Sequence, residues 1–293
     1  MLLPRLQIVA AALLFSTGGA AIKLTHLASW QIACFRSLIA VVALLALIPE
    51  TRRQWTRMTW LAGTAYCGAL LFFVLATKLT SAANAIFLQA ASPLYVLILS
   101  PWLLKERLRP SDFLLMAALA TGLLCAFLGQ PVQSATAPNP ALGNILGSFS
   151  GLSWGLALIA LRRMSRGGDA SAGIRTAVVG NLLTFFVCLP AAASLPFQPG
   201  WTDWLSLGYL GLFQVALAYA LLIRGISHVP AVESAALLLA EAALNPVWAW
   251  IFAQEAQPIL ALIGGAIILT AMLVNLWWKS RAASAEPAVI PSQ

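Results

Sequence analysis

Apolar runs about as long as a bilayer is thick follow one another along almost the whole chain. We predict ten helices, at residues 6–25, 30–48, 58–78, 80–104, 112–129, 141–162, 172–195, 203–225, 229–253 and 258–278. A helix of about 20 apolar residues spans the hydrocarbon core of a membrane. The pattern therefore predicts an all-α, polytopic membrane protein with ten transmembrane helices.

The composition agrees with this class and argues against a soluble protein. Of 293 residues, 61% are hydrophobic and 9% are charged, whereas soluble domains carry roughly a quarter charged residues. The net charge of +8 comes from short loops beside apolar segments, so it orients helices and does not indicate nucleic-acid binding. Cys34, Cys67, Cys125 and Cys188 lack metal-type spacing, and we expect them to be buried as small apolar residues.

Basic residues gather on one side of the predicted membrane. With the N-terminus in the cytoplasm, cytoplasmic stretches hold fourteen of the seventeen Lys and Arg residues, and only Lys23, Lys78 and the intrahelical Arg36 lie elsewhere. Because basic loops stay in the cytoplasm, both termini are expected there, in a bacterial cytoplasmic (inner) membrane. Arg5 before an apolar run imitates a signal peptide, but nine similar segments follow and favour a retained helix.

The two halves differ in the charge of equivalent loops. Residues 104–109 carry three basic side chains around Glu106, whereas their counterpart 149 positions later keeps Glu255 and carries none. Equivalent loops of opposite basicity indicate halves that sit upside down relative to each other, a common build of secondary transporters. We expect repeat 1 at 1–129, a linker at 130–140, repeat 2 at 141–279 and a flexible cytoplasmic tail at 280–293.

An internal alignment supports this duplication. At an offset of 139, Lys23 meets Arg162 and Arg36 meets Arg175. At an offset of 149, six identities follow: Ala82, Leu88, Ala91, Glu106, Ala117 and Thr121 meet Ala231, Leu237, Ala240, Glu255, Ala266 and Thr270. An odd number of five helices per half requires the second copy to enter the membrane from the other side, which agrees with the charge inversion.

Several short motifs, in order, resemble a known family. They are Phe15-Ser16-Thr17-Gly18 through Lys23, Phe35-Arg36-Ser37, Ala82-Ala83-Asn84-Ala85 through Ser92-Pro93 to Lys105-Glu106-Arg107, and the weaker copy Ala240-Glu241-Ala242 to Gln254-Glu255. Over about residues 6–278 the chain resembles the drug/metabolite transporter (DMT) superfamily, in its EamA-type branch of two five-helix repeats.

The resemblance implies a ten-helix bundle with a central cavity between the repeats. Its members typically export small organic metabolites or drug-like compounds, often in exchange for protons, and others import metabolites. We expect a secondary carrier of small organic solutes that works by alternating access, as a proton-coupled exporter, with no cofactor. An uncoupled or importing carrier is the alternative, and a homodimer is compatible with this architecture.

Glu241 is the leading candidate for proton coupling. It falls near the middle of the predicted helix 229–253, where a charged side chain costs about 2.5–3.5 kcal/mol on insertion scales. Because desolvation disfavours the charged carboxylate, such a group can take and release a proton as solvent access alternates. The alternative is a permanently protonated or Arg-paired glutamate that only fixes packing.

Three further charged residues suit structural roles. Arg36 can donate to carbonyl groups of a neighbouring helix, and its counterpart Arg175 falls near the other membrane face. Glu233 lies near the cytoplasmic end, where we expect an ion pair with Arg175 or Arg224. The sequence thus favours Arg36, Arg175 and Glu233 as structural ion-pairing residues, with substrate contact by Arg36 and a position of Glu233 at the cavity as the alternatives.

Polar residues and prolines interrupt two corresponding helices. Residues 80–104 contain Asn84, Gln89, Ser92 and Pro93, and residues 229–253 contain Glu241, Asn245 and Pro246. A proline frees a backbone carbonyl that a ligand can use, and broken helices often carry transporter binding sites. We expect helix breaks at both prolines and substrate contacts from Asn84, Gln89, Ser92 and Asn245, with ordinary interhelical hydrogen bonding as the alternative.

Small residues recur every four positions along residues 141–162. Gly143, Gly147, Gly151 and Gly155 form a stripe that lets another helix backbone approach closely, so we expect helix packing. Trp154 points away from this stripe and could stack on an organic substrate, or simply pack or face lipid.

Missing motifs limit the alternatives. The chain has no G-x-x-x-x-G-K phosphate loop, no H-E-x-x-H and no G-x-S-x-G, and its histidines, His26 and His228, are far apart in the sequence, which argues against ATP drive and a paired metal site. One alternative is a membrane-embedded enzyme, but no nucleophile or metal set accompanies the two acids. Another is a scaffold that transports nothing, which would have a fully packed or lipid-filled centre. The expected partners are a small-molecule substrate, protons and the lipid bilayer.

Overall fold

The computed structural model describes residues 2–166, 171–226, 228–229 and 231–285. Its elements are α1 (Leu2–Ser16), α2 (Gly18–Leu24), α3 (Ser29–Leu47), η1 (Pro49–Arg52), α4 (Arg57–Leu79), α5 (Ala82–Ala90), α6 (Ser92–Leu103), α7 (Pro110–Leu128), α8 (Pro140–Arg166), α9 (Ala172–Ala193), α10 (Trp201–Gly208), η2 (Tyr209–Leu217), α11 (Ala218–Ile226), α12 (Ala231–Ala253) and α13 (Ile259–Ala285). Within these described ranges the chain is helical and forms no strand longer than an isolated bridge.

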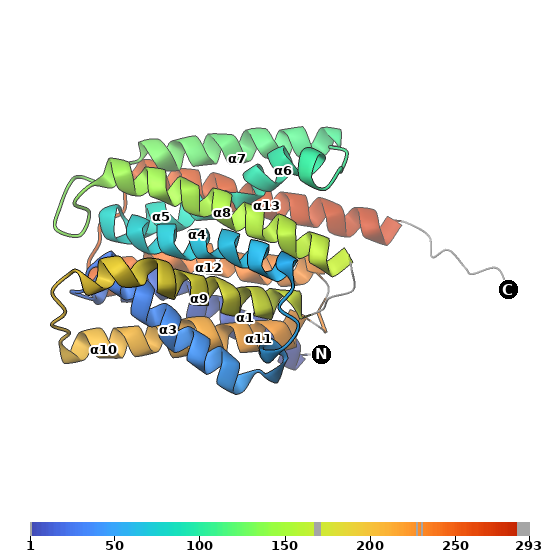
Figure 1. The fold of residues 1–293 in the computed structure, drawn as a ribbon. Helices are drawn as coiled ribbons and strands as arrows, with labels where there is room; N and C mark the ends of the chain where they lie inside the picture. The colour runs from blue at the N-terminus through green and yellow to red at the C-terminus, as the bar shows by residue number, and fades with distance from the viewer. Residues whose placement is uncertain (1, 167–170, 227, 230, 286–293) are drawn as a thin grey trace.

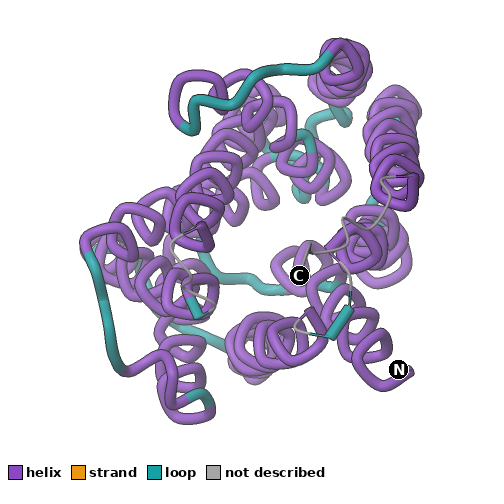
Figure 2. Tube along the Cα trace, turned by 90° about the vertical axis from the view of Figure 1, so that its right-hand side faces the viewer, coloured by secondary structure: helices purple, strands orange, loops and turns teal. Residues whose placement is uncertain are grey.

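The elements combine into a bundle of membrane-spanning helices. Among the described residues, ten helical segments are long and apolar enough to cross a membrane, which confirms the predicted fold class. The helices lie along a common direction (Figure 1) and surround the bundle axis when viewed nearly end-on (Figure 2). We call the end with Arg5, Glu106 and Arg162 the basic end, and the end with Lys23 and Glu255 the opposite end.

Three spans depart from a regular α-helix. The first breaks at Thr17, where the Ser16 and Thr17 hydroxyls donate to carbonyls three residues earlier, a local bond that competes with the helix. The fourth breaks at Ala91, between α5 and α6. In the eighth, residues 209–217 form a π-helix, a form that is often found at functional sites.

The two prolines in corresponding spans behave differently. Pro93 is the second residue of α6, where a missing N–H costs no helical bond, and the span is interrupted just before it. α12 instead continues through Pro246, so the helix break expected there is wrong. One proline removes one backbone hydrogen bond, and packing of α12 against α1 and α2 holds the helix on both sides of it.

The inverted duplication is visible in the backbone of two matched loops. Lys105 and Gln254, 149 residues apart, have left-handed φ angles of 54° and 52°. The next residue in each loop is a glutamate, and its N–H donates to the carbonyl six residues earlier, from Glu106 to Ser100 at 3.4 Å and from Glu255 to Ala249 at 3.3 Å. The first loop lies at the basic end and the second at the opposite end.

The last helix is longer than expected. α13 continues to Ala285, six residues past the boundary expected at 279, because small and basic residues with good helix propensity follow Trp278. Residues 286–293 of the expected tail lie outside the described part of the chain. The cysteines are all reduced, and Cys34, Cys67 and Cys188 are buried.

The glycine stripe of α8 faces the broken span α5–α6. A Cβ on Gly151 would lie 2.6 Å from the Leu88 carbonyl oxygen, and one on Gly155 would lie 3.2 Å from that of Ser92. A Cβ on Gly143 would lie 2.7 Å from Thr80, and a Cβ on Gly147 would lie 2.9 Å from the Leu88 side chain. The absence of side chains thus brings two helix backbones into direct contact.

Candidate functional site

Glu241 lies in mid-membrane without a partner. It is the eleventh of the 23 residues of α12, about 12 Å along the helix from Glu233 at the basic end. The Glu241 side chain is half-buried, and it makes no hydrogen bond or ion pair to any residue that the structure describes. Asn245 and Trp248 follow four and seven residues later and share its face of the helix.

This face of α12 meets the break between α1 and α2. The Trp248 indole N–H donates to the Ser16 hydroxyl at 2.8 Å. The Asn245 amide lies against Gly19, where a Cβ would come within 2.5 Å of its Oδ1, so a side chain at residue 19 would displace this amide. Both amide atoms of Asn245 are buried without a hydrogen-bond partner in the described structure. Since buried polar groups are normally bonded, this amide is available to a ligand.

The π-helix contributes a second unpaired amide beside the same break. A Cβ on Gly18 would lie 2.8 Å from Gln214 Nε2, and Gln214 Oε1 is buried without a partner among the described residues. The Tyr209 and Thr17 hydroxyls share a hydrogen bond of 2.7 Å. The break in the first span is therefore lined by polar groups from α12 and from η2.

An aromatic cluster adjoins Glu241. The Tyr219 hydroxyl donates to that of Tyr66 at 2.6 Å. Phe15 packs edge-on against Tyr219 with ring centroids 5.4 Å apart, and Trp154 contacts Tyr66 with centroids 5.5 Å apart. Tyr66 and Tyr219 lie near enough to Glu241 for electrostatic interaction with its carboxyl. Phe15 and Trp154 pack on these two rings and complete the cluster.

Sequence reasoning named Trp154 but missed its aromatic neighbours. Phe15, Tyr66 and Tyr219 lie on three different spans, and aromatic residues are common in membrane helices, so no local pattern marks them. The polar tyrosine hydroxyls in mid-span were the one available signal, because a buried hydroxyl in lipid needs a partner.

Two of the proposed substrate contacts serve as clamps between helices. Asn84 Nδ2 donates to the Gly129 carbonyl at 2.8 Å and to Asn144 Oδ1 at 3.0 Å. Gln89 Nε2 donates to the Ser150 hydroxyl at 2.7 Å. These bonds join α5 to α7 and α8, which corresponds to the alternative role of interhelical hydrogen bonding. Ser92 is buried, and its carbonyl lies against Gly155 of the glycine stripe.

The expected ion-pairing residues have other surroundings. Glu233 pairs with Arg5, with 2.5 Å between Arg5 Nε and Glu233 Oε1, so the expected pairing with Arg175 or Arg224 is wrong. Parallel packing of α1 against α12 brings these two helix starts together. Arg36 is buried and donates to the Leu70 carbonyl on α4 at 3.4 Å, as an anchor and not as an ion pair. Arg175 is buried in α9.

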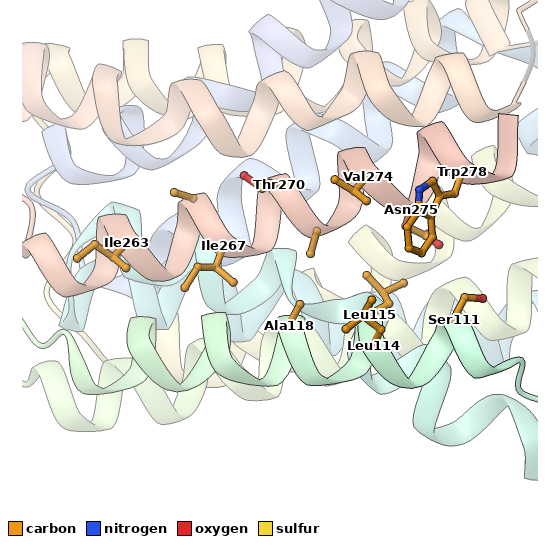
Figure 3. Close-up of a pocket in the computed structure, with 12 residues that line it drawn as sticks. Ser111, Leu114, Leu115, Ala118, Ile263, Ile267, Thr270, Val274, Asn275 and Trp278 are labelled. Atoms are coloured by element: carbon orange, nitrogen blue, oxygen red, sulfur yellow. The ribbon is translucent and has the colours of Figure 1, made fainter. Parts of the chain in front are cut away.

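A groove between α7 and α13 has a different character. It is lined mostly by aliphatic side chains, with Ser111, Thr270 and Asn275 as polar members, and Trp278 lies at its basic end (Figure 3). None of its lining residues is charged. This lining suits lipid chains better than a solute that exchanges with protons.

Metal chemistry has no visible basis in the described residues, because no three His, Cys, Asp or Glu side chains gather there as a metal site would require. The centre of the bundle instead offers one carboxyl, free amides and aromatic rings. Such a set can bind a small organic molecule and a proton.

Comparison with known proteins places the chain in a family. A solved crystal structure with 20% sequence identity aligns with 97% of this chain and 99% of its own at a TM-score of 0.64, which shows a shared fold. No curated protein matches the sequence. The family model for EamA-like transporters matches residues 3–128 and 141–277, one match to each repeat. The chain therefore belongs to the EamA-like transporter family, as its motifs indicated.

Proposed function

We propose that the protein is a proton-coupled secondary transporter that exports small organic solutes by alternating access. The observation that carries this proposal is Glu241, a carboxyl in mid-membrane that is partly accessible and has no described partner. A structural glutamate would be expected to form an ion pair or hydrogen bonds. A carboxyl without them can exchange its proton whenever one side of the membrane gains access.

The coupling follows from competition for one carboxyl. Burial disfavours an isolated carboxylate, so Glu241 holds a proton or faces a cationic group of the solute. If the carrier changes its orientation only with one of the two bound, protons entering from one side drive solute out to the other. The membrane is a bacterial cytoplasmic membrane in this proposal, with the basic end in the cytoplasm.

The aromatic cluster supports an organic cation as the solute. Cations bind over the faces of Tyr and Trp rings, and such contacts strengthen when water is excluded. Tyr66, Tyr219 and Trp154 supply these rings beside Glu241. Arg36 also acts on Tyr66 electrostatically, but its side chain is fully enclosed and bonded to Leu70, so it does not offer its charge to a solute. Asn245 would orient a polar group of the solute.

The test is solute-driven proton movement in proteoliposomes under an imposed pH gradient. Amines, amino acids and cationic drugs are added one class at a time to wild type, to Glu241→Gln and to Glu233→Gln. Glutamine keeps size and hydrogen bonding but cannot titrate. We expect one class to release protons through wild type and Glu233→Gln, and Glu241→Gln to show only background proton flux while still binding the solute.

Two results would contradict the proposal. Proton movement at the wild-type ratio in Glu241→Gln removes that residue from coupling. Solute flux that ignores the pH gradient in wild type identifies an uncoupled carrier, the principal alternative. Flux measured with the solute loaded inside and then outside decides between export and import.

A further inference from the structure

Two ion pairs occupy equivalent positions at the two ends of the bundle. At the opposite end, Lys23 on α2 lies 2.8 Å from Glu255, in the loop between α12 and α13. At the basic end, Arg162 on α8 lies 3.1 Å from Glu106, in the loop between α6 and α7. The sequence offsets of 139 and 149 that relate the repeats convert one pair into the other.

The two pairs differ in their environment. The Lys23 and Glu255 side chains are 2% and 4% exposed, whereas Arg162 and Glu106 are 55% and 23% exposed. If the repeats were related by symmetry in every respect, the two pairs would be equally buried. The difference therefore reports the conformation of the whole molecule, in which the opposite end is closed more tightly than the basic end.

The buried pair joins four segments at the opposite end. Lys23 donates to the Thr80 carbonyl at 2.6 Å and to the Thr136 carbonyl. Glu255 Oε2 accepts the N–H of Ala82 at 2.8 Å. One ion pair thus joins α2, the start of α5, the linker between the repeats and the loop before α13. Lys23 and Thr136 also line a surface groove at this end.

We propose that Lys23–Glu255 and Arg162–Glu106 are the two gates of transport, closed in alternation. In the state that the structure shows, both pairs are formed, but the first is buried and the second is exposed to water. In the other state the inverted repeats exchange conformations, so that Arg162–Glu106 becomes buried and Lys23–Glu255 opens to water. An ion pair suits this task because breaking it into water costs little, whereas leaving one partner buried alone costs a lot.

The proposal predicts that equivalent substitutions in the two gates shift the population of transport states in different directions. Glu255→Gln or Lys23→Gln weakens the closed gate and shifts the population toward the state that is open at the opposite end. Glu106→Gln or Arg162→Gln weakens the other state and keeps the population where it is. If the substitutions only disturbed packing, the two gates would not be expected to differ in this way.

The measurement is the labelling rate of one buried cysteine. In a variant whose four native cysteines are alanine, Asn245→Cys places a thiol at a buried position between Glu241 and Glu255. A membrane-impermeant maleimide is added from each side separately. We expect Glu255→Gln to raise labelling from the side of the opposite end on the order of tenfold or more, and Glu106→Gln to leave it at or below the starting rate.

A conservative variant keeps the test independent of folding. Lys23→Arg retains the charge and can still donate to Glu255 and to the Thr80 and Thr136 carbonyls, so it is expected to keep labelling slow. Fast labelling in Lys23→Arg, an unchanged rate in Glu255→Gln, or equal acceleration by Glu106→Gln would each overturn the proposal. The inference rests on the proposed alternating access, but labelling needs no solute and no proton coupling, so it can fail or succeed separately from the role of Glu241.

Discussion

At the scale of single residues, the polar side chains of the bundle divide into those that are satisfied and those that are not. Thr80 and Asn84 donate to Asn144, which in turn donates to the Phe127 carbonyl. Asn245 and Glu241 lack such partners in the described structure. Bonded groups hold helices together in lipid, where no water replaces a lost bond, and in our proposal Asn245 and Glu241 are the positions left for a ligand and a proton.

The satisfied network predicts a stability effect. Asn144→Ala removes the acceptor of Thr80 and Asn84 and frees the Phe127 carbonyl, so we expect a loss of about 1–2 kcal/mol. Thermal unfolding in detergent measures it as a lower Tm. Thr121→Ala is the matched control, because that hydroxyl is exposed and bonds within its own helix at 2.9 Å. An equal loss in both variants would contradict the clamp role of Asn144.

At the scale of elements, side-chain size determines how the spans meet. α8 contacts the α5–α6 span through its glycine stripe, and α12 contacts α2 through Gly19. Both contacts include a broken helix. Breaks expose carbonyl and amide groups, and a glycine opposite a break leaves those groups uncovered by side chains. Glycines thus mark the places where these two broken spans lie closest to a neighbouring helix.

This contact can be tested at Gly151. A Cβ there would lie 2.6 Å from the Leu88 carbonyl oxygen, on a backbone that cannot turn aside. We expect Gly151→Ala to destabilise the protein by about 1–3 kcal/mol, read as a lower Tm. A Cβ on Gly173 would meet nothing within 4 Å. We therefore expect Gly173→Ala to be neutral or stabilising by about 0.5–1 kcal/mol, since alanine favours the helix. A Gly151→Ala protein as stable as wild type would refute the contact.

At the scale of the whole molecule, charge and symmetry are linked. Arg5, Glu106 and Arg162 lie at one end, and Lys23 and Glu255, which the repeat offsets relate to Arg162 and Glu106, lie at the other. The proposed orientation places the basic end in the cytoplasm. The paired loops at Lys105 and Gln254, with equal backbone conformations, show that inversion preserves structure although the surroundings differ.

The orientation itself is open to a direct test. A fluorescent protein that folds only in the cytoplasm, fused after residue 293, is expected to fluoresce, and alkaline phosphatase at the same place to be inactive. Phosphatase inserted in the linker at 130–140, at the opposite end, is expected to be active. The reverse pattern would place the basic end outside and contradict the positive-inside assignment.

The sequence by itself determined the class and the topology. Helix number, the inverted repeats and mid-span Glu241 follow from hydropathy and charge, because lipid permits few ways to satisfy a backbone. These features depend on local or periodic sequence patterns, so they can be recognised in a single sequence. The Glu233 partner was wrong for the opposite reason: it depends on α1 packing in parallel with α12, which no local pattern reveals.

Only the tertiary structure decided which residues meet. Phe15, Tyr66 and Tyr219 come from three distant spans to one place beside Glu241. It also separated the clamp residue Asn84 from the unpaired Asn245, although the sequence presented both as polar residues near a proline. Contacts between distant segments depend on how whole helices pack, and packing depends on the fit of many side chains at once.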